Sequence, residues 1–79
     1  MGMYILTREQ QERKRIAETD LYDILSAHFG RSFGGIRYDA TETSELITYT
    51  VGGEDYTVST YGDSLLYMVA DVINSAKTK

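Results

Sequence analysis

The amino-acid sequence predicts an α+β fold of the order α-β-β-β-α, in which a three-stranded antiparallel sheet carries two helices on one face. Three observations predict it: an amphipathic segment near the start of the chain, two strand-like runs around Gly52 and Gly53, and a second amphipathic segment at the end. The 79 residues, with no cysteine and no proline among them, leave room for one hydrophobic core. We therefore expect a single domain over residues 1–79.

A first helix is predicted over residues 8–29, after a short apolar start at residues 4–6 that predicts an edge strand or an arm. Thr7 is its expected N-cap, because Gln10 follows three residues later in the capping-box pattern, and Gly30 is its expected C-terminal stop. Apolar residues then recur at steps of three and four, which places them on one helix face. This face is expected to contain Ile16, Ala17, Leu21, Ile24, Leu25 and His28.

The basic cluster Arg13–Arg15 lies in the first two turns of this helix. Residues 8–15 are almost all charged or amide side chains, so we expect these turns to be solvated. The cluster allows two interpretations: contacts to phosphate groups, or pairing with glutamates three or four residues away on the same helix. We favour the second, in which Glu9, Glu12 and Glu18 pair with the three bases.

Three strands are predicted at residues 36–40, 45–51 and 54–61. A two-residue Gly-Gly loop is typical of a type I′ hairpin, so Gly52 and Gly53 set the register of the last two strands. In that register the facing pairs on the apolar side are Val51 with Glu54, Tyr49 with Tyr56, and Ile47 with Val58. The opposite side is mostly polar and is expected to face water: Leu46, Thr48, Thr50, Asp55, Thr57 and Ser59.

A last helix is predicted to begin after Gly62, with Asp63 or Ser64 as its N-cap. Its buried stripe is expected to contain Leu65, Val69, Val72, Ile73 and Ala76, with Leu66 and Met68 at the margins. Asp63 at the start of this helix and Lys77 at its end both suit the helix dipole. Packing both helices against the apolar side of the sheet buries all three apolar surfaces at once.

The sequence offers little material for catalysis or for a metal site. His28 is the single histidine, and its place at the end of a helix favours packing or a dipole contact over a catalytic role. Asp39, Glu42 and Glu45 lack the alternating ligands and the central glycine of a calcium loop. The sequence contains no glycine-rich phosphate loop and no apolar run of membrane-spanning length. We expect no enzymatic activity, no cofactor, no metal ion and no membrane contact.

Charge is distributed unevenly along the chain. The net charge is −4, yet residues 38–76 contain acids and no lysine or arginine. These acids are Asp39, Glu42, Glu45, Glu54, Asp55, Asp63 and Asp71. An acidic field repels nucleic acid and attracts basic surfaces. The segment therefore favours a protein partner with a basic surface, such as a nucleic-acid-binding protein, over nucleic acid itself. Solubility alone is the simpler interpretation.

Tyrosine is frequent, with seven residues in the chain. Tyr49 and Tyr56 face each other on the apolar side of the predicted hairpin and are expected in the core. Tyr61 and Tyr67 are expected to face solvent, where tyrosines are typical of binding surfaces, although isolated surface aromatics are equally compatible with the pattern. The candidate partner-binding residues are Asp39, Glu42, Glu45, Glu54, Asp55, Tyr61, Asp63, Tyr67 and Asp71.

Two groups of proteins share the predicted order of elements. The double-stranded-RNA-binding domain has a lysine-rich turn at the start of its last helix, whereas residues 62–65 of this chain contain no base. In size, acidity and order of elements the chain resembles the small inhibitors of bacteriophages and mobile elements, the anti-CRISPR and anti-restriction proteins. This resemblance implies nucleic-acid mimicry, in which acidic residues occupy the nucleic-acid-binding site of a defence protein in the cytoplasm of a bacterial host. The nearest analogues of those acids are the loop at residues 39–45 and the hairpin tip with Glu54 and Asp55.

A second hypothesis assigns the chain to a different class, that of small structural or assembly domains. The threonine-rich side of the sheet, or an edge strand, would then pair with a second copy to form a homodimer. The oligomeric state in solution distinguishes this hypothesis from the first.

Overall fold

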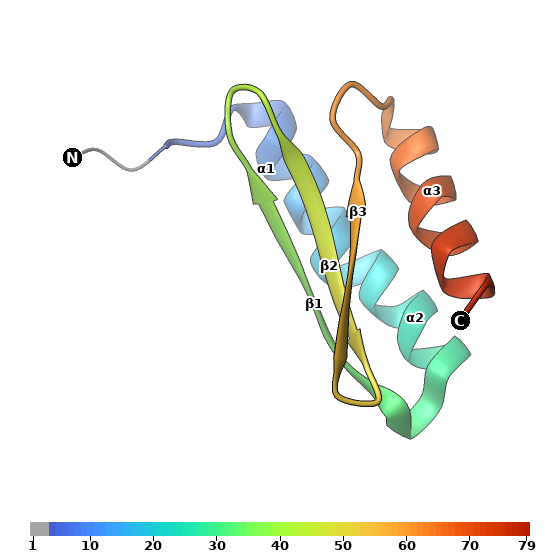
Figure 1. The fold of residues 1–79 in the computed structure, drawn as a ribbon. Helices are drawn as coiled ribbons and strands as arrows, with labels where there is room; N and C mark the ends of the chain where they lie inside the picture. Colours follow the sequence, from blue (N-terminus) through green and yellow to red (C-terminus); the bar gives the residue numbers. More distant parts are fainter. Residues whose placement is uncertain (1–3) are drawn as a thin grey trace.

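The computed structural model describes residues 4–79 and shows the predicted α+β order (Figure 1). The sheet is antiparallel with the strand order β1-β2-β3. The elements are α1 (Arg8–Ile16), the π-helical turn η1 (Ala17–Leu21), α2 (Tyr22–Phe29), the 3₁₀ turn η2 (Gly30–Ser32), β1 (Phe33–Ala40), β2 (Glu45–Val51), β3 (Glu54–Ser59) and α3 (Leu65–Lys77). The continuous segment from α1 to α2 and the helix α3 both pack on one face of the sheet, which leaves the other face open.

The first helix begins with the predicted capping box. The Gln10 backbone N–H donates to Thr7 Oγ1 at 3.1 Å, and the Thr7 N–H donates to Gln10 Oε1 at 3.0 Å. Of the two structures predicted for residues 4–6, an edge strand or an arm, the strand does not form, and the Tyr4 hydroxyl donates to Gln10 Oε1 at 2.9 Å. This segment is therefore an arm tied to the start of α1.

The turn η1 was not predicted, and it changes which residues face the sheet. The buried residues of the first helical segment are spaced by four: Arg13, Ala17, Leu21 and Leu25, with Phe29 half-buried. In a regular α-helix of 3.6 residues per turn, such a series rotates away from one face. A π-helical turn contains more residues and brings the series back towards the sheet. The expected core positions Ile24 and His28 are exposed for this reason.

The hairpin forms in the predicted register. Tyr49 faces Tyr56, and the neighbouring pairs on the apolar side also agree with the prediction. Gly52 and Gly53 have φ values of 60° and 83°, which a two-residue type I′ loop requires and which side chains disfavour. The strand predicted at 54–61 is shorter than expected, because β3 ends at Ser59 and the chain then turns towards α3.

The strand β1 begins at Phe33, three residues earlier than predicted. Its pairing with β2 is irregular between Phe33 and Gly35, where the register shifts and Gly35 has a φ of 138°. This bulge absorbs one extra residue and allows the two glycines to remain in the strand. From Ile36 to Ala40 the pairing is regular.

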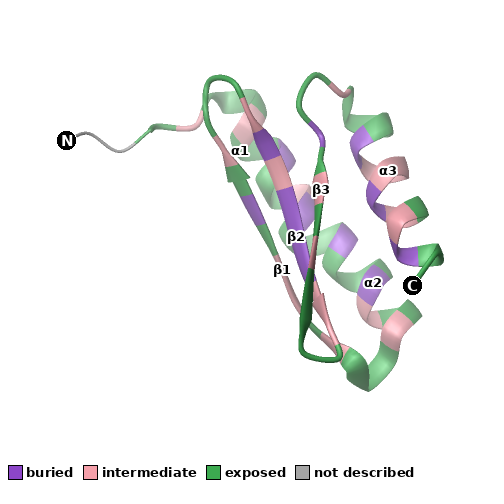
Figure 2. Cartoon of the chain, in the orientation of Figure 1, coloured by how far each residue is buried: buried purple, intermediate pink, exposed green. Residues whose placement is uncertain are grey.

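The core lies between the sheet and the helices, as Figure 2 shows. In α3 the buried residues are Met68, Val72 and Ala76, whereas Leu65 is exposed, so the predicted stripe is displaced around the helix. Two contacts hold the end of α3 against the sheet. Tyr49 Oη lies 2.6 Å from Ser75 Oγ, and Lys79 Nζ lies over the Tyr56 ring, 4.6 Å from its centre. Over the described part of the chain, no helix has the length and apolarity needed to cross a membrane.

Candidate functional site

Arg13 and Glu45 form a buried ion pair between α1 and β2. They are 5% and 6% exposed. Arg13 Nε donates to Glu45 Oε1 at 3.0 Å and to Oε2 at 2.9 Å, and Nη2 also contacts Oε1. The Tyr38 hydroxyl donates to Glu45 Oε2 at 2.8 Å, and Thr60 Oγ1 donates to Oε1 at 2.6 Å. This carboxylate is therefore surrounded by hydrogen-bond donors from three other segments of the chain.

The ion pair corrects two sequence-based expectations, since Arg13 was expected in a solvated cluster and Glu45 among the accessible acids. Glu45 begins β2, and its carbonyl accepts from the N–H of Thr60, which continues the hairpin register by one pair. The Glu45 side chain is therefore on the apolar side of the sheet, where it is buried. A buried carboxylate requires a cation and further donors, which Arg13 supplies from the same end of the molecule. The other two bases pair on the surface as predicted: Lys14 with Glu18 and Arg15 with Glu12.

The surroundings of Glu45 favour its charged form. Burial opposes ionisation, but the hydrogen bonds from Arg13, Thr60 and Tyr38 outweigh it and lower the pKa of Glu45 below its ordinary value. Burial, together with the neighbouring carboxylate, raises the pKa of Tyr38, so the phenol remains a proton donor. The network joins α1, β1, β2 and the turn after β3, and its role is to hold these elements together.

Asp63, in the turn before α3, lies beside Asp71 from the middle of that helix, and the two carboxyls have no such set of donors. Arg13 Nη1 donates to the backbone oxygen of Asp63 at 2.8 Å. Oδ2 of Asp63 is buried and has no hydrogen-bond partner among residues 4–79. The Asp71 carboxyl and then burial raise the pKa of Asp63, partly opposed by the charge of Arg13. The structure thus brings together two of the predicted residues as neighbouring acids.

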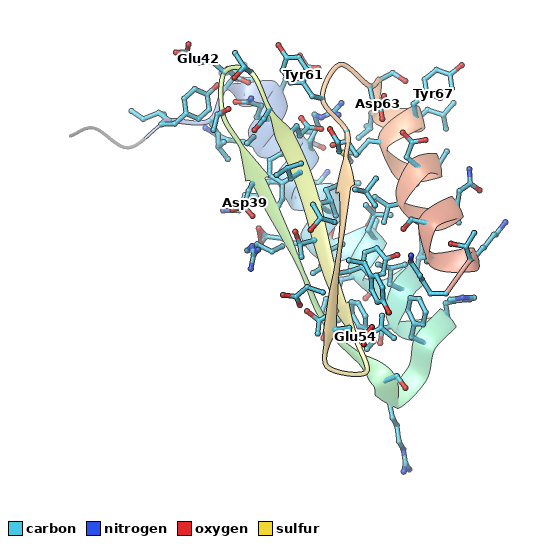
Figure 3. The ribbon with its side chains drawn as sticks, viewed as in Figure 1. Asp39, Glu42, Glu54, Tyr61, Asp63 and Tyr67 are labelled. Atoms are coloured by element: carbon cyan, nitrogen blue, oxygen red, sulfur yellow. The ribbon has the colours of Figure 1, made fainter. Side chains whose placement is uncertain are left out.

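Four predicted residues gather at one end of the molecule: Glu42, Tyr61, Asp63 and Tyr67 (Figure 3). The Tyr61 hydroxyl donates to the backbone oxygen of Glu42 at 3.4 Å, which ties the turn after β3 to the loop between β1 and β2. Tyr61 and Tyr67 are 57% and 65% exposed, in agreement with the prediction, and Leu66 beside Tyr67 is 76% exposed. We call these five residues, Glu42, Tyr61, Asp63, Leu66 and Tyr67, the tyrosine end.

The hairpin tip with Glu54 and Asp55 lies at the opposite end of the sheet (Figure 3). Both carboxylates are used locally, since Tyr56 Oη donates to Glu54 Oε2 at 2.8 Å and Thr50 Oγ1 donates to Asp55 Oδ1 at 2.6 Å. The acids that are close to each other in the sequence segment 39–55 therefore do not form one continuous surface.

Asp39 is separate from both ends. It is the next-to-last residue of β1 and lies on the open face of the sheet, away from both ends in Figure 3, and Arg37 Nε donates to its Oδ2 at 2.8 Å. Arg37 is therefore a basic residue outside the acidic segment that neutralises one of the predicted acids. The structure therefore separates the nine candidate residues: four lie at the tyrosine end, with Asp71 beside Asp63, two lie at the hairpin tip, Asp39 lies on the edge strand, and Glu45 is buried.

A groove of about 550 Å³ lies between α1 and the start of α3. It is lined by Arg8, Glu9, Glu12, Arg13 and Leu65. Sequence reasoning missed the surface roles of Leu65 and Leu66, because it placed both in or beside the buried stripe. The spacing of Met68, Val72 and Ala76 by four is the signal that assigns the two leucines to the surface.

Among residues 4–79, no group of acidic or histidine side chains converges in a way that could hold a metal ion. The fold and its exposed end define a small α+β domain with a candidate protein-binding surface. Comparisons of the chain with protein-family models, with characterised proteins and with solved structures found no match.

Proposed function

We propose that the protein is a non-enzymatic acidic binding protein whose tyrosine end contacts a basic surface of another protein. The observation that carries the proposal is the joint exposure of Tyr61 and Tyr67 beside Glu42 and Asp63. Tyrosines are enriched in protein interfaces, because a rigid ring buries a large area and the hydroxyl still forms hydrogen bonds. Leu66 adds an exposed apolar side chain to the same surface.

The charge of the tyrosine end indicates a basic partner. The segments that build it belong to residues 38–76, which contain acids and no lysine or arginine. Arg13, whose guanidinium reaches the backbone of Asp63, is buried and paired with Glu45, so its charge is compensated internally. Such a surface accelerates the encounter with a positively charged protein, and this effect weakens as salt is added.

Proteins that bind nucleic acid present the basic surfaces that this charge fits best, and we propose that the chain blocks one of them as an inhibitor. The carboxylates of Glu42 and Asp63 take the place of phosphate groups, while the tyrosines supply apolar contact area. This activity needs no cofactor and no catalytic group. It is the mode of action implied by the resemblance in size, acidity and order of elements to phage-type anti-CRISPR and anti-restriction inhibitors, and we propose that the protein acts in the cytoplasm of a bacterial cell.

The proposal is tested by capturing bacterial proteins on the immobilised chain and then adding salt or duplex DNA and RNA. We expect the captured proteins to be nucleic-acid-binding ones that are released by both treatments, because ions and phosphates compete with the carboxylates. The double variant Tyr61→Ala/Tyr67→Ala should reduce capture by at least about tenfold, since interface tyrosines are frequent anchors.

The matched control is the double variant Glu54→Gln/Asp55→Asn, which removes two charges at the opposite end of the sheet. We expect it to capture the same proteins as the wild-type chain, with circular dichroism confirming that both variants are folded. Capture that survives the loss of both tyrosines, or that nucleic acid does not reverse, would contradict the proposal.

A further inference from the structure

The outer side of β1 is an open sheet edge. The strand order β1-β2-β3 leaves that side without a neighbouring strand, and Figure 1 shows no described element along it. The strand is eight residues long, which is enough to pair with another extended chain. The backbone groups and charges along this edge determine which strand can pair with it.

The hydrogen-bonding phase of β1 identifies its available backbone groups. The Thr41 N–H donates to the Ser44 carbonyl at 2.8 Å, and antiparallel strands alternate between hydrogen-bonded and non-hydrogen-bonded pairs. Arg37 and Asp39 are in the same phase as Thr41, so their N–H and C=O groups point towards β2. The backbone groups that point outward from the regular part of the strand belong to Ile36, Tyr38 and Ala40.

The side chains on the open face of β1 are self-complementary in charge. Arg37 and Asp39 are both more than half exposed and stand on either side of Tyr38. If two copies of β1 pair antiparallel with Tyr38 opposite Tyr38, Arg37 of each copy faces Asp39 of the other. These are the non-hydrogen-bonded pairs, in which the Cα atoms approach to about 4.5 Å.

The same register also satisfies the backbone. It places Ile36 opposite Ala40 and Tyr38 opposite itself, so the outward N–H and C=O groups of all three residues are paired. Moving the centre by one residue in either direction places arginine opposite arginine or aspartate opposite aspartate, which is unfavourable. The two charges therefore select one register and disfavour its neighbours.

We propose that two copies of the chain form a symmetric dimer through β1, in the register centred on Tyr38, which joins their sheets into one. The two-fold axis is perpendicular to the sheet, so the helices of both copies lie on the same face and each copy uses the same surface. The inference is independent of the proposed function, because the edge around Asp39 and the tyrosine end are different surfaces (Figure 3).

Sedimentation of the full chain from micromolar to millimolar concentration tests the dimer. The wild-type chain is expected to approach twice the 8.9 kDa of one copy. The variants Arg37→Asp and Asp39→Arg each place like charges in every facing pair, so each alone should dimerise at least about tenfold more weakly. In an equimolar mixture, each introduced aspartate faces an introduced arginine, so the mixture should form a heterodimer.

The equimolar mixture distinguishes pairing between two copies from the Arg37–Asp39 pair within one copy. Both variants lose the internal Arg37–Asp39 pair, so only pairing between copies can restore association. The matched controls Ser59→Asp and Ser59→Arg, on the open face of β3, should dimerise like the wild-type chain. Amide exchange at Tyr38 should slow with increasing concentration. A wild-type chain that stays monomeric, single variants that dimerise normally, or a mixture that remains monomeric would each overturn the proposal.

Discussion

Glu45 and Asp63 lie near the same arginine and have opposite environments. Glu45 accepts hydrogen bonds from three side chains, which lower its pKa despite burial. Asp63 lies beside Asp71, one of its oxygens has no partner among the described residues, and its pKa is raised. Arg13 gives side-chain hydrogen bonds to the Glu45 carboxylate but contacts only the backbone of Asp63.

The comparison shows that the donors aimed at a carboxylate decide its charge state more than its burial does. The donors converge where α1, β1 and β2 meet, so the Glu45 region contributes to stability. The Asp63 region keeps uncompensated negative charge beside the exposed tyrosines. The first region is expected to be sensitive to substitution in unfolding experiments, and the second in binding experiments.

The largest effect is expected from Glu45→Ala. This variant leaves the Arg13 guanidinium buried without a counter-charge, which lowers the free energy of unfolding by about 3–5 kcal/mol. A domain of this size is expected to have a total stability of about 5 kcal/mol, so the variant should be largely unfolded in mild urea. Circular dichroism during urea titration measures the change.

The matched control for this variant is Glu42→Ala at the exposed tyrosine end. A surface substitution there should change the free energy of unfolding by no more than about 0.5 kcal/mol. Equal effects of Glu42→Ala and Glu45→Ala on the free energy of unfolding would show that the buried ion pair is no more important for stability than an exposed carboxylate.

A smaller loss is expected from Tyr38→Phe. It removes one donor from the Glu45 carboxylate while Arg13 and Thr60 remain, and a hydrogen bond to a charged group contributes about 1.5 kcal/mol. Tyr56→Phe is the control, since that hydroxyl bonds an exposed carboxylate at the hairpin tip. If the two phenylalanine variants unfold at the same urea concentration, the Tyr38 hydroxyl is not part of the stabilising network.

The smallest effect, and one of opposite sign, is expected from Asp63→Asn. Because the folded state raises the pKa of Asp63, ionisation of this group weakens the fold as pH rises above 3.8, its ordinary pKa. The asparagine variant should therefore melt at a slightly higher temperature than the wild-type chain at pH 7, and the difference should disappear in acid. Asp71→Asn should give the same gain, and the double variant should show no further gain. A lower melting temperature at pH 7 would contradict the proposed repulsion.

The contribution of Glu45 to stability changes with pH in the opposite direction to that of Asp63. Its folded-state pKa is lowered, so its contribution to stability is complete above 4.5 and is lost as pH falls through the folded-state value. The Asp63→Asn comparison is for this reason best made against wild-type melting curves over the whole acid range.

The parts of the fold that follow from local rules could be predicted. Thr7 and Gln10 form the capping box because both groups lie within one turn. Gly52 and Gly53 set the hairpin register because a two-residue loop has few conformations. The exposure of Tyr61 and Tyr67 was also predicted, because the alternation of a strand and the period of a helix assign them to solvent.

The candidate site was less predictable. Its acids were selected as neighbours in the sequence, whereas β2 and β3 carry Glu54 and Asp55 to the far end of the sheet from Glu42. Extending the hairpin register by one pair would have placed Glu45 opposite Thr60 on the apolar side. A carboxylate at such a position is the signal that a buried cation must be found elsewhere in the chain.

The order of the elements, the hairpin register and the acidity of the second half of the chain can be read from the sequence, because each follows from neighbours a few residues apart or from composition. Which charges are buried, which acids share a surface and where η1 turns the first helical segment are set by the folded arrangement of the chain. Those outcomes depend on contacts between distant segments, as between Arg13 and Glu45, whose cost of burial is offset only when the sheet brings their donors and acceptors together.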